Sequence, residues 1–96
     1  MTKEEILDIL KKKKDFIQSE FSVEKIGLFG SYAKNIATQE SDIDFYVEFK
    51  NKTFDNIAGL WVYLESLYDK KIDIVHKHKY NNPTLLKRIK KDIIYG

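Results

Sequence analysis

The sequence contains no cysteine and no long apolar run. Without cysteine the chain has no disulfide, no thiolate nucleophile and no cysteine zinc site, so a bound metal would need oxygen or imidazole ligands. Crossing a bilayer takes about 20 apolar residues, and no stretch approaches that length. The N-terminal MTKEEILDILKKKK also lacks the order of a secretory signal. We therefore expect a cytoplasmic protein without membrane contact.

Arginine is almost absent as well, because Arg88 is the sole arginine among 17 basic residues. Specific readout of nucleic-acid bases and phosphates relies on the planar, bidentate fork of arginine. The net charge is only +2. Direct nucleic-acid binding is therefore not expected, and a small mobile polyanion suits this charge pattern better.

Hydrophobic periodicity predicts one α/β domain that spans all 96 residues, with a small three-stranded sheet and about four helices. Asn82-Pro83 is a typical helix start, and the apolar stripe of that last helix includes Ile93 and Ile94. Gly27 leaves space inside the first strand for a neighbouring backbone or a ligand. The expected elements are a helix over 2–19, a strand over 26–29, a short helix from 31, a strand over 42–49, a helix over 54–68, a strand over 71–76 and the final helix.

The stretch 26–49 combines two patterns typical of a phosphate and metal site. A short apolar run ends in Gly30-Ser31, where a turn can present backbone N–H groups to a phosphate if a helix begins there. After a ten-residue spacer, Asp42 and Asp44 open a second apolar run. Aspartates at i and i+2 on a strand share a face and repel each other unless a cation, usually a hard divalent ion, lies between them. The alternative is a hairpin-like turn followed by a strand with solvated aspartates.

A third aspartate, Asp73, lies between two isoleucines in the last predicted strand. A carboxylate buried there without a partner would be costly. One interpretation is that Asp73 completes a metal site with Asp42 and Asp44. The other is an edge-strand aspartate that pairs with Lys70 or Lys71.

The spaced combination of these residues resembles the signature of the DNA polymerase beta-type nucleotidyltransferases, in particular the minimal nucleotidyltransferases (MNT). The resemblance covers most of the chain and implies a mixed sheet with helices packed on it, the site lying at the Gly-Ser and Asp-x-Asp end. Its motif consists of Gly30-Ser31, the spacer, Asp42-Ile43-Asp44 and, on another strand, Asp73.

The resemblance also implies roles for these residues toward ATP and Mg²⁺. Gly30 and Ser31 would contact the β- and γ-phosphates. Asp42 and Asp44 would hold one or two Mg²⁺ ions that neutralise the leaving pyrophosphate and orient the α-phosphate. Asp73 would ligate the ion nearest the acceptor hydroxyl and help to deprotonate it.

The chain departs from the family pattern at Lys34-Asn35, where Arg-Gly is common. Lysine keeps the positive charge but loses the fork, so Lys34 would contact a phosphate as a point charge. The alternative for Lys34 is an exposed, solvated lysine. Asn35 can replace glycine in a left-handed conformation, so the short helix can end in the same way.

The expected function also follows from the resemblance. Minimal nucleotidyltransferases are typically paired with HEPN proteins, often RNase toxins, and act as antitoxins by transferring AMP from ATP to a tyrosine of the partner. Because the predicted elements use the chain from Thr2 to Tyr95, an acceptor is expected from another molecule. Two alternatives stay open: a non-catalytic antitoxin that neutralises its partner by binding alone, and nucleotide transfer to a small molecule such as an aminoglycoside.

Overall fold

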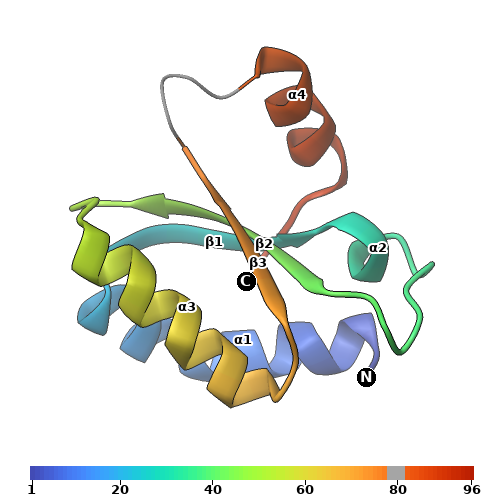
Figure 1. Cartoon of the computed structure of the whole chain (residues 1–96), viewed down its shortest axis with the longest axis horizontal. Helices are drawn as coiled ribbons and strands as arrows, with labels where there is room; N and C mark the ends of the chain where they lie inside the picture. The colour runs from blue at the N-terminus through green and yellow to red at the C-terminus, as the bar shows by residue number, and fades with distance from the viewer. Residues whose placement is uncertain (78–81) are drawn as a thin grey trace.

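Four strands form one mixed sheet in the order β3-β2-β1-β4 in the computed structural model, which describes residues 1–77 and 82–96 (Figure 1). The central pair, β1 (Val23–Phe29) and β2 (Ile43–Phe49), is antiparallel. β3 (Ile72–His76) runs parallel to β2 on one side, and the short β4 (Ile94–Tyr95) runs antiparallel to β1 on the other. The predicted α/β class with a mixed sheet is confirmed.

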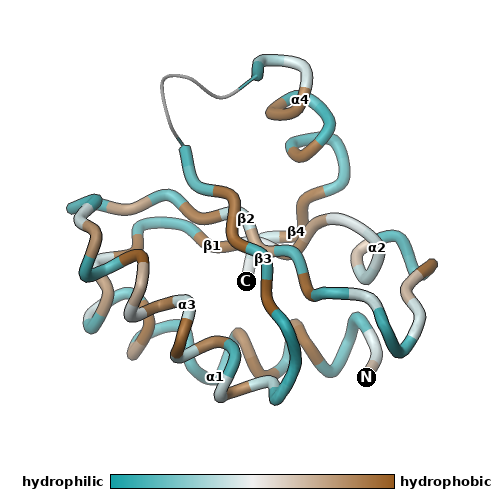
Figure 2. Tube along the Cα trace, viewed as in Figure 1, coloured by the Kyte–Doolittle hydropathy of each residue, from teal (hydrophilic) through white to brown (hydrophobic). Residues whose placement is uncertain are grey.

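Helices lie on both sides of this sheet (Figure 1). α1 (Lys3–Glu20) and α3 (Phe54–Tyr68) cover one face, while α4 (Pro83–Asp92) stands over the other, and the one-turn α2 (Gly30–Ala33) lies at the end of β1. The hydropathy of the trace shows apolar stripes on α1 and α3 (Figure 2). The core between them and the sheet consists mainly of Ile6, Leu10, Ile17, Ile26, Leu28, Ile43, Phe45, Val47, Leu60, Leu64, Tyr68, Ile72 and Ile74.

Local sequence signals account for where the helices begin. Thr2 and Glu5 form a reciprocal capping box on α1, with both hydrogen bonds at 3.2 Å. Thr53 caps α3 by accepting a hydrogen bond from the N–H of Asn56. Asn82 accepts from the N–H of Thr84 at 2.8 Å, so the start of α4 is capped in the same way. None of the helices in the described ranges is long and apolar enough to cross a membrane.

The end of the chain differs from the sequence-based expectation. The sequence pattern predicts that Ile93 and Ile94 belong to the apolar stripe of the last helix, which would leave a three-stranded sheet. Instead α4 ends at Asp92, Ile93 has extended backbone angles, and Ile94 pairs with Leu28 as part of β4. The fourth strand satisfies backbone groups on the β1 edge that a helix would have left open.

Gly27 explains why the chain can cross β1 closely at this point. A Cβ on Gly27 would lie 2.6 Å from Cγ1 of Ile93 and 3.1 Å from the carbonyl oxygen of Ile94. The space that the glycine leaves is therefore filled by residues 93–94 of the chain itself. Of the two possibilities, a neighbouring backbone and not a ligand lies beside Gly27. Ile93 and the buried Ile89 thus fix the C-terminal half of α4 to the sheet.

Candidate active site

The Gly30-Ser31 turn lies where β1 passes directly into α2. Gly30 adopts a left-handed φ of 78°, which a residue with a side chain rarely adopts. A Cβ at this position would overlap the carboxylate of Asp44, only 3.0 Å from its Cγ. Glycine is therefore required here for two reasons, the backbone angle and the close approach of Asp44.

The helix that follows is a single turn, in agreement with the short helix that the sequence predicts from Ser31. α2 has four residues, and no side chain caps its N-terminus. A single turn has little macrodipole, so the positive end of a helix contributes little here. The donors available for a phosphate are the backbone N–H groups of the turn and the hydroxyl of Ser31, which is partly exposed.

Asp44 lies between this turn and Asp73. On β2, Asp44 is the pairing partner of Phe29 in β1, the residue before Gly30. On its other side it is the partner of Asp73 in the parallel strand β3. Asp42 directly precedes β2, two residues before Asp44. The sheet register therefore gathers the three aspartates and the glycine turn at one end of the strands.

The pKa of Asp44 reflects its closeness to the other two aspartates. Burial, followed by the carboxylates of Asp73 and Asp42 in that order of importance, raises its pKa from 3.8 to about 6. The site thus holds an excess of negative charge when it is empty of cations. A divalent ion would relieve that repulsion, so these carboxylate oxygens fit a hard cation that prefers oxygen ligands.

The carboxylates do not form a complete metal cage on their own. Among residues 1–77 and 82–96, no three His, Cys, Asp or Glu side chains are arranged to hold an ion. Mg²⁺ is commonly bound through one or two carboxylates together with substrate phosphates and water. Two or three aspartates beside a phosphate-binding turn are therefore compatible with an ion that is held jointly with a nucleotide.

Asp73 is exposed, so the burial cost expected for an aspartate between two isoleucines does not arise. Its neighbours Ile72 and Ile74 point into the core on the opposite face. Lys70, one of the two lysines considered as its partner, donates instead to the carbonyl oxygen of Gln39 at 3.0 Å. Asp73 is therefore accessible to an incoming molecule.

Lys34, the third residue expected to contact the nucleotide, forms an ion pair. Its Nζ lies 3.4 Å from Oδ2 of Asp92, the last residue of α4. Sequence reasoning did not single out Asp92, because it follows a run of basic residues in a helix expected to be solvated. Only the fold brings α4 and α2 into contact.

The residue after Asp44 on the same strand face is Tyr46, which is almost fully buried at 1% exposure. Burial, followed by the nearby charges of Glu48 and Tyr95, raises the pKa of Tyr46 to about 12. Glu48 follows Tyr46 on the same face of the strand. The buried Tyr46 therefore blocks access to this face of β2 beyond Asp44. The part of the face that solvent can reach is the end near Asp42.

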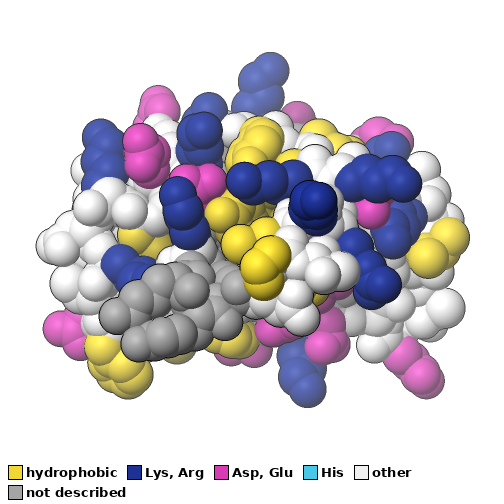
Figure 3. Space-filling view, turned by 90° about the horizontal axis from the view of Figure 1, so that it is seen from above, with side chains coloured by type: hydrophobic (Ala, Val, Ile, Leu, Met, Phe, Trp, Pro, Cys, Tyr) yellow, Lys and Arg dark blue, Asp and Glu magenta, His cyan; other side chains and the backbone are white. Residues whose placement is uncertain are grey.

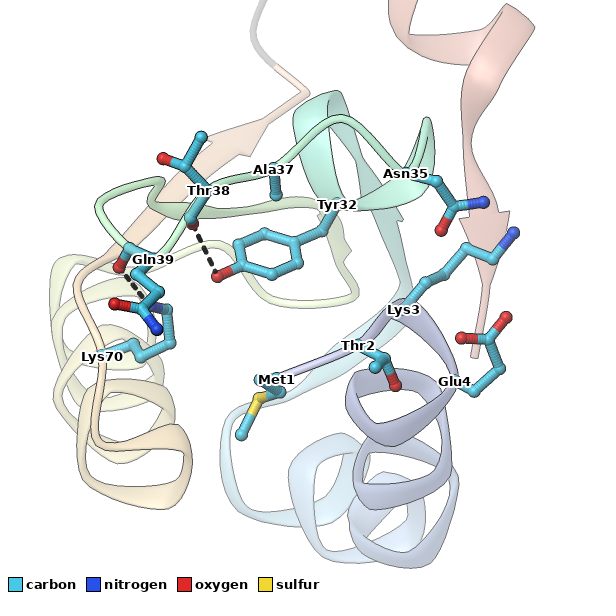
Figure 4. Close-up of a pocket in the computed structure, with 10 residues that line it drawn as sticks. All are labelled: Met1, Thr2, Lys3, Glu4, Tyr32, Asn35, Ala37, Thr38, Gln39 and Lys70. Carbon is cyan, nitrogen blue, oxygen red and sulfur yellow. Dashed lines mark hydrogen bonds between the residues drawn. The ribbon is translucent and has the colours of Figure 1, made fainter.

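A cavity of about 360 Å³ lies elsewhere, between the start of α1, the segment 35–39 and Lys70 (Figure 4). The ring of Tyr32 points into it, and its hydroxyl donates to the carbonyl oxygen of Thr38 at 3.4 Å. None of the three aspartates, nor Gly30 or Ser31, lines this cavity. We place the candidate active site at the carboxylates, because chemical groups and not volume decide where phosphates and cations bind.

Comparison with known proteins identifies the family. The family model described as polymerase beta nucleotidyltransferase matches residues 4–96, so the chain belongs to this nucleotidyltransferase family. A candidate protein adenylyltransferase of Methanocaldococcus jannaschii is 40% identical, over 98% of this chain and 97% of its own. The protein adenylyltransferase MntA of Thermococcus cleftensis is 32% identical, over 99% and 96%.

Solved structures give the same result for the fold. The structure of a candidate minimal nucleotidyltransferase matches with a TM-score of 0.82 and 25% identity, over 98% of this chain and 95% of that one. A toxin-antitoxin crystal structure with AMP-PNP matches with a TM-score of 0.65 and 26% identity, over 99% and 72%. The predicted family and fold are thus confirmed.

Proposed function

We propose that this protein transfers AMP from ATP to a tyrosine hydroxyl of a HEPN-type RNase toxin and so acts as its antitoxin. The observation that carries the proposal is the position of Asp44, held between the Gly30 turn and Asp73. A turn that can bind phosphates, and neighbouring carboxylates whose repulsion a cation would relieve, are the parts that nucleotidyl transfer requires. The names of the two adenylyltransferase relatives support AMP as the transferred group, and the toxin-antitoxin structure with AMP-PNP supports a toxin as the partner.

ATP would bind with its β- and γ-phosphates against the backbone N–H groups of Gly30 and Ser31. The left-handed glycine keeps this turn free of a side chain, so phosphate oxygens can approach the backbone closely. Asp42 and Asp44 would hold one or two Mg²⁺ ions jointly with the phosphates, and Asp73 would take part in the same ion binding. When bound, Mg²⁺ supplies neutralisation of the phosphate charge.

Asp73 is the residue available to the acceptor, because it is the exposed member of the carboxylate group. In the proposed reaction the tyrosine oxygen bonds to the α-phosphorus while the bond from that phosphorus to the bridging oxygen of the β-phosphate breaks. Pyrophosphate leaves, and the proton of the tyrosine hydroxyl passes to Asp73. The product is an AMP-tyrosine phosphodiester on the partner.

The test uses the purified chain, a HEPN-type toxin as its partner, ATP and MgCl₂. Intact-mass spectrometry should show one or more AMP additions on the partner with the parent protein. Asp44→Asn should abolish them while the two proteins still co-purify, because the change keeps the volume of the side chain and leaves the outer surfaces intact. The proposal fails if the parent protein adds no mass to its partner.

The same variant separates catalysis from the alternative of an antitoxin that works by binding alone. If AMP transfer neutralises the toxin, Asp44→Asn should fail to protect cells or should protect only at stoichiometric expression. Full protection by Asp44→Asn at low expression would favour neutralisation by binding.

A further inference from the structure

We infer that Asp92 sets the affinity of the site for nucleotide by competing with phosphate for Lys34. This inference rests on the proposed function, since it concerns the same site. Asp92 belongs to α4, far from the glycine turn in sequence, and no sequence motif includes it. The ion pair between the Nζ of Lys34 and Oδ2 of Asp92 is the observation that links the two helices.

Lys34 is placed to serve the glycine turn. It directly follows α2 as the C-cap residue, and its N–H donates to the carbonyl oxygen of Gly30 at 3.1 Å, which closes the one-turn helix. Residues three and four apart on a helix lie on one side, which puts Lys34 on the side of Ser31 and Gly30. A phosphate bound to that turn would lie within reach of the flexible lysine side chain.

Lys34 carries a single positive charge, for which the carboxylate of Asp92 and a nucleotide phosphate would compete. In the structure the charge is engaged by Asp92, whose side chain is 33% exposed, while that of Lys34 is 51% exposed. This partly solvated pair can be broken at small cost. A triphosphate is a stronger anion than a single carboxylate, so its binding would draw Lys34 away from Asp92.

The rest of α4 does not depend on this pair. Ile89 is buried, Ile93 packs over Gly27, and β4 pairs with β1. Neutralising Asp92 should therefore leave the helix in place.

On the outer side of α4, basic side chains surround a group of hydrophobic ones in the view onto this face (Figure 3). The exposed basic residues of α4 are Lys87, Arg88, Lys90 and Lys91.

Two consequences follow from the competition. Asp92 lowers the affinity for nucleotide in the resting protein, and by linkage nucleotide loosens the contact between α2 and α4 by the same factor. The expected factor is about two- to fivefold, which corresponds to about 0.4–1 kcal/mol for a half-exposed ion pair.

The test is calorimetric titration of the full chain with ATP in MgCl₂. Asp92→Asn should tighten binding about two- to fivefold, and Lys34→Gln should weaken it. In the Lys34→Gln background, Asp92→Asn should have no further effect, because there is no lysine left to compete for. Asp8→Asn is the matched control: it removes an exposed aspartate that pairs with Lys12 at 3.0 Å on α1, and ATP affinity should not change.

Several results would overturn the inference. Weaker binding by Asp92→Asn would mean that Asp92 orients Lys34 for the phosphate instead of competing with it. A gain that persists in the Lys34→Gln background would be a general charge effect, and an unchanged affinity would mean that the pair is irrelevant to nucleotide. These results leave the proposed function standing, whereas absence of ATP binding by the parent protein, alone and with its partner, would overturn both.

Discussion

Replacing Asp44 with asparagine should stabilise the nucleotide-free protein even though it destroys the proposed activity. Asp44 has a pKa of about 6 in the folded protein against an ordinary value of 3.8. The folded state therefore binds this proton more tightly than the unfolded state. Stability falls as the pH rises from about 4 to about 6, and above that the full penalty is present.

The size of the penalty follows from the same values. A difference of this size corresponds to at most about 3 kcal/mol. Because Asp44 is only half-buried, solvent screens part of the repulsion, and we expect about 1 kcal/mol. For a domain of this length that is an increase in Tm of about 4–8 °C.

The assay is thermal unfolding followed by circular dichroism at pH 8 and at pH 4, with chelator and without nucleotide. Asp44→Asn should melt higher than the parent protein at pH 8, and the two should melt alike at pH 4, where Asp44 is already protonated. Asp8→Asn, at an exposed ion pair on α1, should show no such gain. A variant that is no more stable at pH 8, or a gain of equal size at both pH values, would refute the reasoning.

Three further predictions concern the surroundings of Asp44. Gly30→Ala should lower stability by about 1–3 kcal/mol in urea unfolding and abolish ATP binding, because it combines a left-handed φ with a Cβ against the carboxylate of Asp44. Gly27→Ala should displace Ile93 and speed hydrogen exchange of the β4 amides, whereas unchanged exchange would show that the contact adapts freely. Removal of Mg²⁺ by chelator should weaken ATP binding about tenfold or more in calorimetry, and equal binding would exclude a shared ion site.

Periodicity predicted most of the fold because the buried faces are regular. In β2 the residues Ile43, Phe45 and Val47 alternate with polar ones, and they are fully buried, as expected. The prediction for the end of the chain was wrong for a physical reason. Ile93 and Ile94 continue a helical spacing, but tertiary pairing with β1 and the space above Gly27 favour an extended chain. Such a choice depends on a neighbour distant in sequence, which no local pattern records.

The candidate site, like the fold, has one part that the sequence predicts and another that depends on contacts between distant residues. The spacing of Gly30, Asp42 and Asp44 could be read from the sequence, because a turn and one strand place them together. The pairing of Asp44 with Asp73 depends on strand order, and the partnership of Lys34 with Asp92 depends on where α4 docks. Neither contact has a local signature.

The central claim is that nucleotide and cation bind together between the glycine turn and the aspartates. The most direct measurement is a crystal structure of the chain with a non-hydrolysable ATP analogue and Mn²⁺, in which anomalous scattering locates the metal. We predict a Mn²⁺ peak ligated by Asp42, Asp44 and phosphate oxygens, with the phosphates against Gly30 and Ser31. Nucleotide in the cavity lined by Tyr32 and Lys70, with no metal at the aspartates, would contradict the account.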